Sequence, residues 1–457
     1  TILLVRFWFM WLNKIKNLNK ILIGIVSLVF LLGLYSFVFA QHEPSYSVWQ
    51  GGFIRTFDSS YNDFPRDVAI DPNKKQIYVT GYSWDASAQG FYAGSGWSGE
   101  SGEASSDETV LLRYEDLGNS YNLTFRDIWS ASENSDGGLK IAIDETRRFL
   151  YIVGTAAKND TDCENSPGYY NNCWDLMVLR YDISPDEPQR IGSPWIWDDL
   201  DYNHIGIDAE VDSNGYLYIV GMGGNDSYTH PRNNFNQYIT IGVSIHRPDI
   251  FVMKVDPQFF GSATTSPVVW YQEYSSGIYW SVSDHSYSLV LDEISNIVYV
   301  IGYSRTLGGS GYSNWIVLRY DLDGNSLDGG SPWISYDSSD LGINVRDYAW
   351  DGTLDTSGNL VILGRSEDFT QAKYGNKYAG CRPVQNDRII KIDKNTGNII
   401  FNQLYSTVFD DFFGGWDNDG EEIKGGLDLD SSGSLHLAGF FWQGRTYNIK
   451  TIKTTSS

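Results

Sequence analysis

The stretch from Asp67 to Ser83, DVAIDPNKKQIYVTGYS, reads as two short strands joined by a polar turn. An aliphatic run ends in an aspartate, a few turn residues follow, and a second aliphatic run ends in a glycine. Similar stretches begin at Ile141, Ala209, Leu289, Gly352 and Gly426. Their closing glycines are about 60–80 residues apart, so six copies of one unit, each with insertions, make up most of the chain.

Two more strand-like segments follow in the units. The third strand is seen in VLLRYED from Val110 and WIVLRYD from Trp315, and the fourth, in the first five units, carries an aromatic residue. Four short antiparallel strands per unit are typical of a β-propeller blade. The last unit lacks a fourth strand, but residues 45–53, SYSVWQGGF, resemble one. The sequence therefore predicts an all-β, six-bladed β-propeller of four-stranded antiparallel blades, closed by an N-terminal strand that completes the last blade. A parallel β-helix has a far shorter repeat, and two sandwiches would not repeat in this way.

The repeated aspartate and glycine have a structural interpretation. The aspartate lies where the first strand turns into the second, where its carboxylate can accept backbone N–H groups across the turn. The repeat places it at Asp71, Asp144, Asp212, Asp292, Asp355 and Asp430. The glycine of the turns DSNG, DTSG and DSSG is expected to supply a positive φ, and the second-strand glycine to allow a close backbone approach.

The first unit, DVAIDPNKKQIYVTGYS with DETVLLRYE and a later tryptophan, resembles the SBBP-type β-propeller repeat. That repeat occurs in secreted and cell-surface proteins of bacteria and archaea, and NHL- and YVTN-type propellers are also similar. The resemblance covers residues 45–453, and it implies a fold but no catalytic motif. The chain departs from the pattern in its long insertions and in having six units, where the family name implies seven blades.

The N-terminal segment, residues 1–40, has four basic residues and no acidic residue, and it ends in an apolar run with a small-residue site at Val38–Ala40. This pattern predicts a signal peptide, so that residues 41–457 form one propeller domain. An uncleaved N-terminal membrane anchor is the alternative, because the apolar run can just span a bilayer. Either interpretation implies export, and an extracellular or cell-surface location.

Composition limits the partners. The chain carries 57 Asp and Glu against 33 Lys and Arg, a net charge of −24. An acidic surface repels nucleic acid and anionic lipid, so we expect no nucleic-acid partner, and membrane contact only through residues 1–40. Cys163 and Cys173 bracket a short segment and are a candidate disulfide, which leaves Cys381.

Long segments fall on one side of the predicted blades. They join second to third strands at Trp84–Asp107, Ala156–Trp174, Gly223–Pro248 and Glu367–Asn386, and outer to inner strands at Tyr274–His285 and Phe409–Lys424. Both classes leave a four-stranded meander at the same end, so this face is the predicted binding face. It is rich in aromatic residues among Asp, Asn and Gly, which suits a polyhydroxylated ligand. The candidate ligand-binding residues are Tyr92, Trp97, Tyr170, Trp174, His204, His285, Arg346 and Trp416.

Acidic residues cluster at the starts of the inner strands. A ring of carboxylates there could hold calcium, the candidate ion, although no EF-hand spacing is present. The candidate metal ligands are Asp67, Asp208, Asp284, Asp347 and Glu421. No residue is predicted to be catalytic, because neither a G-x-S-x-G motif nor a G-x-G-x-x-G motif that leads into a helix occurs.

Three functions fit the sequence. The leading hypothesis is a binding or adhesion module for a glycan or protein ligand on the loop-rich face. The first alternative is a propeller hydrolase, lyase or sugar dehydrogenase with a metal-assisted site at the central mouth, which requires His204, His285 and several carboxylates to converge. The second alternative is a surface-layer or filament subunit.

Overall fold

The computed structural model divides the chain into two units, Thr1–Ile54 and Arg55–Ser457. The structure describes residues 63–71, 73–84, 107–116, 121–130, 136–158, 173–197, 203–224, 238–239, 243–244, 249–262, 265–276, 284–305, 313–336, 345–368, 384–406, 426–429, 435–443 and 446–454. All of these belong to the second unit, and the rest of this section concerns that unit alone. Among these residues no helix is long and apolar enough to cross a membrane.

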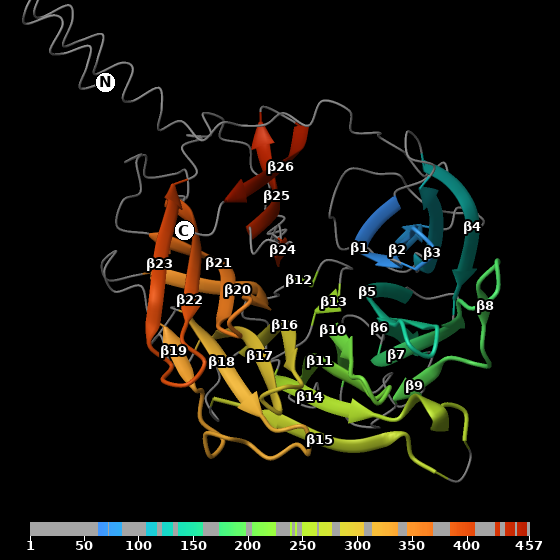
Figure 1. The fold of residues 1–457 in the computed structure, drawn as a ribbon, viewed down its shortest axis with the longest axis horizontal. Helices are drawn as coiled ribbons and strands as arrows, with labels where there is room; N and C mark the ends of the chain where they lie inside the picture. The colour runs from blue at the N-terminus through green and yellow to red at the C-terminus, as the bar shows by residue number, and fades with distance from the viewer. Residues whose placement is uncertain are drawn as a thin grey trace, which may run out of the picture. The chain divides into compact units, whose positions relative to one another are not determined.

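The described residues form antiparallel sheets whose strands follow one another in chain order, as Figure 1 shows. The first sheet holds β1 (Asp63–Asp71), β2 (Gln76–Trp84), β3 (Asp107–Asp116) and β4 (Tyr121–Trp129). The second holds β5 (Asp136–Asp144), β6 (Phe149–Lys158), β7 (Cys173–Asp182), β8 (Gln189–Arg190) and β9 (Trp195–Trp197). The third holds β10 (Asn203–Val211), β11 (Leu217–Gly224), β14 (Asp249–Val255) and β15 (Val268–Tyr274).

The remaining sheets continue this order. The fourth holds β16 (Asp284–Asp292), β17 (Ile297–Ser304), β18 (Asn314–Tyr320) and β19 (Ile334–Tyr336). The fifth holds β20 (Val345–Leu354), β21 (Leu360–Asp368), β22 (Val384–Ile392) and β23 (Ile399–Ser406). The sixth has three described strands, β24 (Gly426–Leu429), β25 (Leu435–Gln443) and β26 (Thr446–Thr454). A small hairpin of β12 (Tyr238–Ile239) and β13 (Val243–Ser244) and a 3₁₀ helix, η2 (Pro257–Phe259), complete the described elements.

Two fourth strands are shorter than the sequence predicts. In the second sheet the fourth position is divided, because β8 and β9 both pair with β7. In the fourth sheet only Ile334–Tyr336 pairs with β18. Pro194 and Pro332 lie just ahead of these strands, and a proline has no N–H to donate to a sheet.

Successive sheets pack through a shared apolar core. The first strands β1, β5, β10, β16, β20 and β24 each contact the next in this order, and we call them the inner strands. Four clusters of buried residues join neighbouring sheets from the first to the fifth. The second-strand tyrosines Tyr78, Tyr151, Tyr218 and Tyr299 are buried in these clusters. This order of meander sheets, packed face to face through their inner strands, is the organisation of β-propeller blades.

The inner strands share one irregularity, which explains the repeated glycine. Each of the first five skips one residue in its pairing with the second strand, at Pro65/Asp67, Gly138/Lys140, Gly206/Asp208, Ser286/Ser288 and Ala349/Asp351. The β-bulge brings an inner-strand carbonyl oxygen against the second strand. A Cβ on Gly302 would lie 1.8 Å from the oxygen of His285, and one on Gly221 would lie 2.0 Å from that of Ile205. The predicted close backbone approach is therefore confirmed.

The short turns are also as predicted. Oδ1 of Asp212 accepts N–H groups from Asn214 and Tyr216, and Oδ1 of Asp355 accepts from Ser357 and Asn359. Gly215 and Gly358 have φ angles of 84° and 78°. The same turn bonds occur at Asp71, Asp144 and Asp292. Asp430 lies outside the described residues.

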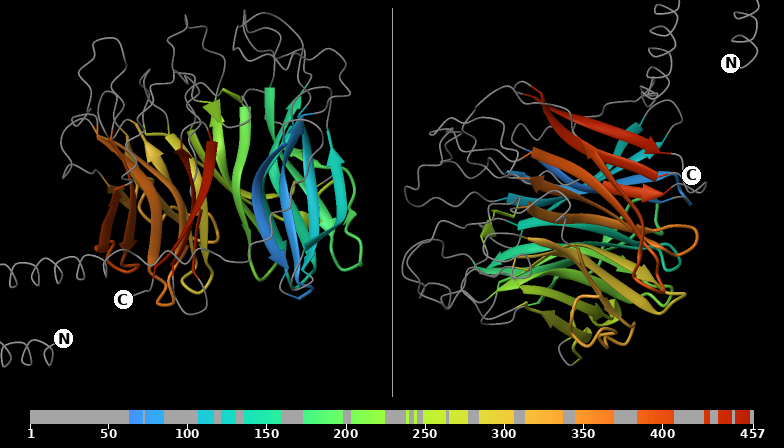
Figure 2. Two further views of the ribbon diagram at one scale, coloured as in Figure 1. Left: turned by 90° about the horizontal axis from the view of Figure 1, so that it is seen from above. Right: turned by 90° about the vertical axis from the view of Figure 1, so that its left-hand side faces the viewer.

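The two ends of the sheets differ in their connections. The segments 85–106, 159–172, 225–248 and 369–383 join second to third strands at one end, which we call the long-connection end. The opposite, short-turn end carries connections such as 72–75, 145–148 and 293–296. Figure 2 shows the strands of successive sheets running between these same two ends.

Candidate functional site

The clearest polar assembly of the described residues lies along the inner strands. One side chain follows the β-bulge in each repeat, four residues before the turn aspartate, and it faces the next sheet. These residues are Asp67, Lys140, Asp208, Ser288 and Asp351. The sixth repeat has Gly426 at this position, four residues before Asp430. We call the charged members, together with Glu210, the inner-strand charge cluster.

These side chains connect the first five sheets in order. Asp67 Oδ2 accepts the Ile141 N–H at 2.8 Å, and Lys140 Nζ lies 3.0 Å from Asp208 Oδ1. Asp208 Oδ2 then accepts the Leu289 N–H at 2.7 Å. Ser288 Oγ donates to Asp351 Oδ1 at 3.1 Å. The carboxylates thus supply acceptors for N–H groups on the open edge of the neighbouring inner strand, groups that a sheet edge leaves unpaired.

Lys140 is the cation of the cluster. Its Nζ also lies 3.8 Å from Asp67 Oδ2, and its side chain is 32 % exposed. Burial opposes the charged form, but Asp208, Asp67 and Asp351 together raise the pKa of the ammonium group. Lys140 therefore stays protonated throughout the physiological range, and it balances part of the negative charge around it.

Glu210 lies two residues beyond Asp208 on β10 and is half-buried. Its Oε2 accepts the Leu291 N–H at 3.3 Å. Burial raises the pKa of Glu210 to about 8, the negative charges of Asp208 and Asp351 add to this, and Lys140 and the Leu291 N–H oppose it. Near neutral pH this carboxyl group therefore carries a proton and can act as a proton donor.

The predicted metal ligands do not form one set. Asp67 and Asp208 converge on Lys140, so the ammonium group takes up charge that a cation would otherwise balance. Asp284 is fully buried and accepts bonds from the N–H and Oγ of Ser276, which fixes the chain as it enters β16. Asp347 is fully buried and accepts from Ser366 Oγ. Within the described part of the chain, no group of three or more His, Cys, Asp and Glu could hold a metal ion.

The two histidines lie in different sheet interfaces. His204 is 2 % exposed and packs against Trp197, with ring centroids 4.4 Å apart, and against Phe251. His285 is 2 % exposed and stacks on Tyr303 at 4.6 Å. Tyr303 in turn makes an edge contact with Tyr348 of the fifth sheet. The convergence that the enzyme alternative requires of this pair is not seen.

The other predicted site residues fall outside the described part of the chain. Tyr92, Trp97, Tyr170, Trp416, Glu421 and Cys163 are among them. For Cys173 and Trp174 in β7 and for Arg346 in β20 the backbone is described but the side chain is not. The predictions of aromatic ligand contacts and of a Cys163–Cys173 disulfide therefore stay predictions.

Sequence reasoning missed Lys140, Glu210, Ser288 and Asp351. The signal was present, because Lys140, Ser288 and Asp351 occupy the repeat position that Asp67 and Asp208 share. Aligning the six units on their turn aspartates would have shown them. Glu210 has no such signal, because only the packing of β10 against β16 reveals its environment.

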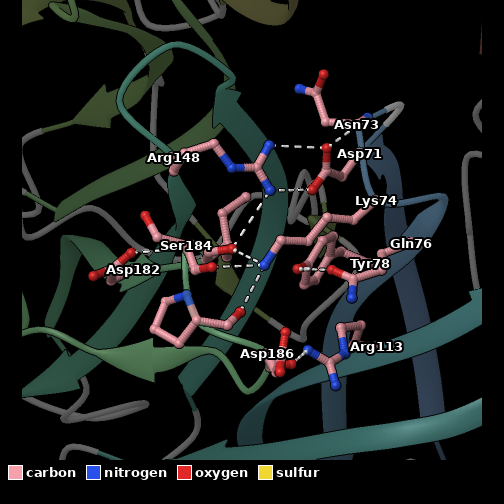
Figure 3. A network of polar contacts seen from close by, with 12 residues as sticks. Asp71, Asn73, Lys74, Gln76, Tyr78, Arg113, Arg148, Asp182, Ser184 and Asp186 are labelled. Atoms are coloured by element: carbon pink, nitrogen blue, oxygen red, sulfur yellow. Dashed lines mark hydrogen bonds and ion pairs between the residues drawn. The ribbon is translucent and has the colours of Figure 1, made fainter.

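A second polar network lies at the short-turn end between the first two sheets (Figure 3). Arg148 bonds both oxygens of the buried Asp71 carboxylate. Lys74 Nζ donates to three consecutive carbonyl oxygens, those of Ile183, Ser184 and Pro185, at 2.7–3.0 Å. Arg113 donates to the Asp186 carbonyl oxygen. Across the two sheets these basic side chains bond a turn aspartate and backbone carbonyl groups, so the network joins the sheets.

The repeated basic residue of the third strand extends this pattern. It lies one residue before the end of the apolar run in VLLRYED and its copies. Arg180 donates to the Pro257 carbonyl oxygen, and Lys254 to that of Leu322, each in the following sheet. The basic residue of the third strand therefore contacts the following sheet at Arg113, Arg180 and Lys254, whereas Arg319 bonds Asp328 of its own sheet.

Comparisons with known proteins add three structural neighbours. No protein-family model and no curated protein sequence matches the chain. A sialidase of Trypanosoma rangeli in complex with sialic acid is similar at 12 % identity and a TM-score of 0.44, over 86 % of this chain and 54 % of that one. The chain thus spans about half the length of that sialidase. A polysaccharide lyase, an ulvan lyase of family PL25, matches at 11 % identity and a TM-score of 0.45, over 86 % and 82 %. A protein of unknown function from Dyadobacter fermentans DSM 18053 matches at 12 % identity and a TM-score of 0.48, over 86 % and 93 %.

Proposed function

We propose that the chain is a secreted or cell-surface β-propeller that binds a glycan or protein ligand at its long-connection end. The observation that carries the proposal is the uneven length of the connections. Segments such as 85–106 and 225–248 leave one end of the sheets, while the other end has turns as short as 145–148. Binding residues gather on loops that a rigid scaffold positions.

The sheets beneath the long-connection end are well packed and can act as a scaffold for binding loops. Strands are buried where they reach this end, as Ile250, Tyr303 and Trp315 show with 1 % exposure or less. The buried carboxylates of Asp284 and Asp347 also fix chain segments at this end. A binding face on a pre-organised scaffold lowers the ordering cost of binding.

The residue types of the long connections favour a glycan. Trp97, Trp174 and Trp416 occur among Gly, Asn and Asp in the sequence. Aromatic faces stack on the C–H faces of sugars, while amides and carboxylates bond their hydroxyl groups. With a net charge of −24, the chain should favour neutral over anionic glycans.

The six-bladed closure belongs to the same proposal. Val68 and Ile70 on β1 face away from the second sheet and are 59 % and 64 % exposed. The repeat equivalents of Val68 face the preceding sheet and are buried: Ile141 is 4 % exposed, and Ala209 and Leu289 are each 1 % exposed. We infer that the sixth sheet, with residues 45–53 as its fourth strand, covers Val68 and Ile70 and closes the ring. The SBBP-type resemblance and export through residues 1–40 complete the proposal.

The test is retention of residues 41–457 on insoluble neutral cell-wall glycan. Replacement of Trp97, Trp174 and Trp416 by alanine should weaken binding about 10-fold per residue that stacks on the ligand, because each buried aromatic contact contributes about 1–2 kcal/mol. Phe259→Ala is the matched control, since Phe259 is an exposed aromatic residue of η2 at the short-turn end. Retention of the triple variant equal to that of the control would contradict the proposal.

A further inference from the structure

Glu210 is placed where a change in its charge acts on three sheets at once. It lies on β10 of the third sheet and accepts the Leu291 N–H of β16 in the fourth. Lys140 on β5 of the second sheet lies against Asp208, which is two residues away from Glu210 on the same strand. The contact between β10 and the strands on both sides therefore depends on this group of side chains.

The charges that act on Glu210 come from three inner strands. Among the described residues, β5 contributes Lys140, β10 contributes Asp208 and β20 contributes Asp351. From β16 come the backbone N–H of Leu291 and the hydroxyl group of Ser288, which bonds Asp351. Asp67 of β1 is linked to these residues through its contact with Lys140. One cation thus lies near four carboxyl groups, and a proton on Glu210 removes one negative charge from this group.

We propose that the inner-strand charge cluster is a pH-operated lock between the second, third and fourth sheets, closed when Glu210 is protonated and loosened when it ionises. With Glu210 neutral, Lys140 is shared between Asp67 and Asp208, and Asp208 remains free to accept the Leu289 N–H. An ionised Glu210 adds a negative charge beside Asp208 and Asp351 in a half-buried site. The edge of β16, held by Asp208 and Glu210, then separates more readily from β10.

The direction of the pH dependence follows from the shifted pKa. Its value in the folded protein, about 8, lies above the ordinary value of 4.5 that applies once the edge is open and solvated. The closed state therefore binds the extra proton between these values, and its advantage declines as the pH rises through this window. Opening of the β16 edge should increase about 10-fold or more between pH 6 and pH 8.

The experiment is hydrogen exchange, read by mass spectrometry on peptides that cover Asp284–Asp292 of β16. Rates are corrected for the intrinsic pH dependence of amide exchange. The wild-type protein should lose protection in this strand about 10-fold or more between pH 6 and pH 8. The isosteric variant Glu210→Gln should have flat protection over the same range. Glu187→Gln, at an exposed position between β7 and β8, is the matched control and should follow the wild type.

A second variant tests the same mechanism through the cation. Lys140→Gln removes the charge that favours ionised Glu210 in the closed state, so the loss of protection should continue to a higher pH before it levels off than in the wild type. Identical pH profiles for the wild type and Glu210→Gln would overturn the proposal. An unshifted or downward-shifted profile in Lys140→Gln would also overturn it.

Discussion

At the scale of single residues, the turn aspartates close their own turns, and Asp71 also joins neighbouring sheets. It accepts the Asn73 N–H within its own turn, and its carboxylate bonds Arg148 of the next sheet. Asp212 has Lys254 of its own sheet at 3.9 Å from its Oδ2. Arg148 itself has a φ of 61°, a strained conformation that its ion pair helps to maintain. At Asp71 the repeated turn signature therefore also carries part of the packing between sheets.

We expect Asp71→Asn to lower the free energy of unfolding by about 2–3 kcal/mol at pH 7, because a charged hydrogen-bond pair with a buried carboxylate is lost. Although burial alone would raise it, Arg148 lowers the pKa of Asp71 below its ordinary value of 3.8. The stabilisation is therefore present above about pH 4 and is lost as the pH falls through the folded-state pKa.

Urea unfolding at pH 7 and at pH 3 measures this difference. Asp182→Asn is the control, since Asp182 Oδ1 accepts a turn N–H from Ser184 in the same way (Figure 3). A loss in Asp71→Asn that is no larger than in Asp182→Asn would contradict the assigned role of the ion pair with Arg148.

At the scale of elements, the β-bulge of the inner strand and the glycine of the second strand depend on each other. The bulge turns an inner-strand carbonyl group toward the second strand, and only glycine leaves space for it. The bulge also sets which side chain follows, and so it aligns Asp67, Lys140 and Asp208 toward neighbouring sheets. The repeat thus specifies the geometry of the inner-strand charge cluster, whereas the residue type at this position, and so its charge, differs between repeats.

Gly302→Ala should destabilise the protein by about 3 kcal/mol or more, because its Cβ would overlap the His285 carbonyl oxygen in a paired strand. Gly261→Ala is the comparison. Gly261 has a φ of 80° and open space around it, so the substitution should cost only about 1 kcal/mol in backbone strain. Thermal unfolding of the two variants decides between them, and similar losses would show that the steric explanation is wrong.

At the scale of the whole molecule, packing between sheets dominates the stability, because a single sheet cannot bury its own apolar faces. Four apolar clusters join the first five sheets. Basic residues such as Arg113 and Arg180 fasten third strands to the following sheet. Val68 and Ile70 on β1 are exposed, whereas Ile141, Ala209 and Leu289, the repeat equivalents of Val68, are buried.

Val68→Asp tests closure of the ring. If the sixth sheet covers this position, burying the carboxylate should cost about 2–4 kcal/mol of unfolding free energy. Leu123→Asp on β4 is the control, because Leu123 is 42 % exposed on an outer strand and should tolerate the change within about 0.5 kcal/mol. Equal, small effects in chemical unfolding of both variants would mean that the first inner strand stays open.

The sequence by itself determined the repeating meander, the turn aspartates and the need for glycine in the second strand. These depend on contacts between residues close in the chain, so strand alternation and turn chemistry suffice to predict them. It also found Asp67 and Asp208 as members of an inner-strand group. Only the tertiary structure showed that Lys140 lies between them and that Glu210 faces Asp351, because those residues come from different repeats. Likewise, burial of His204 and His285 follows from sheet faces that pack together over long sequence separations, which no local pattern records.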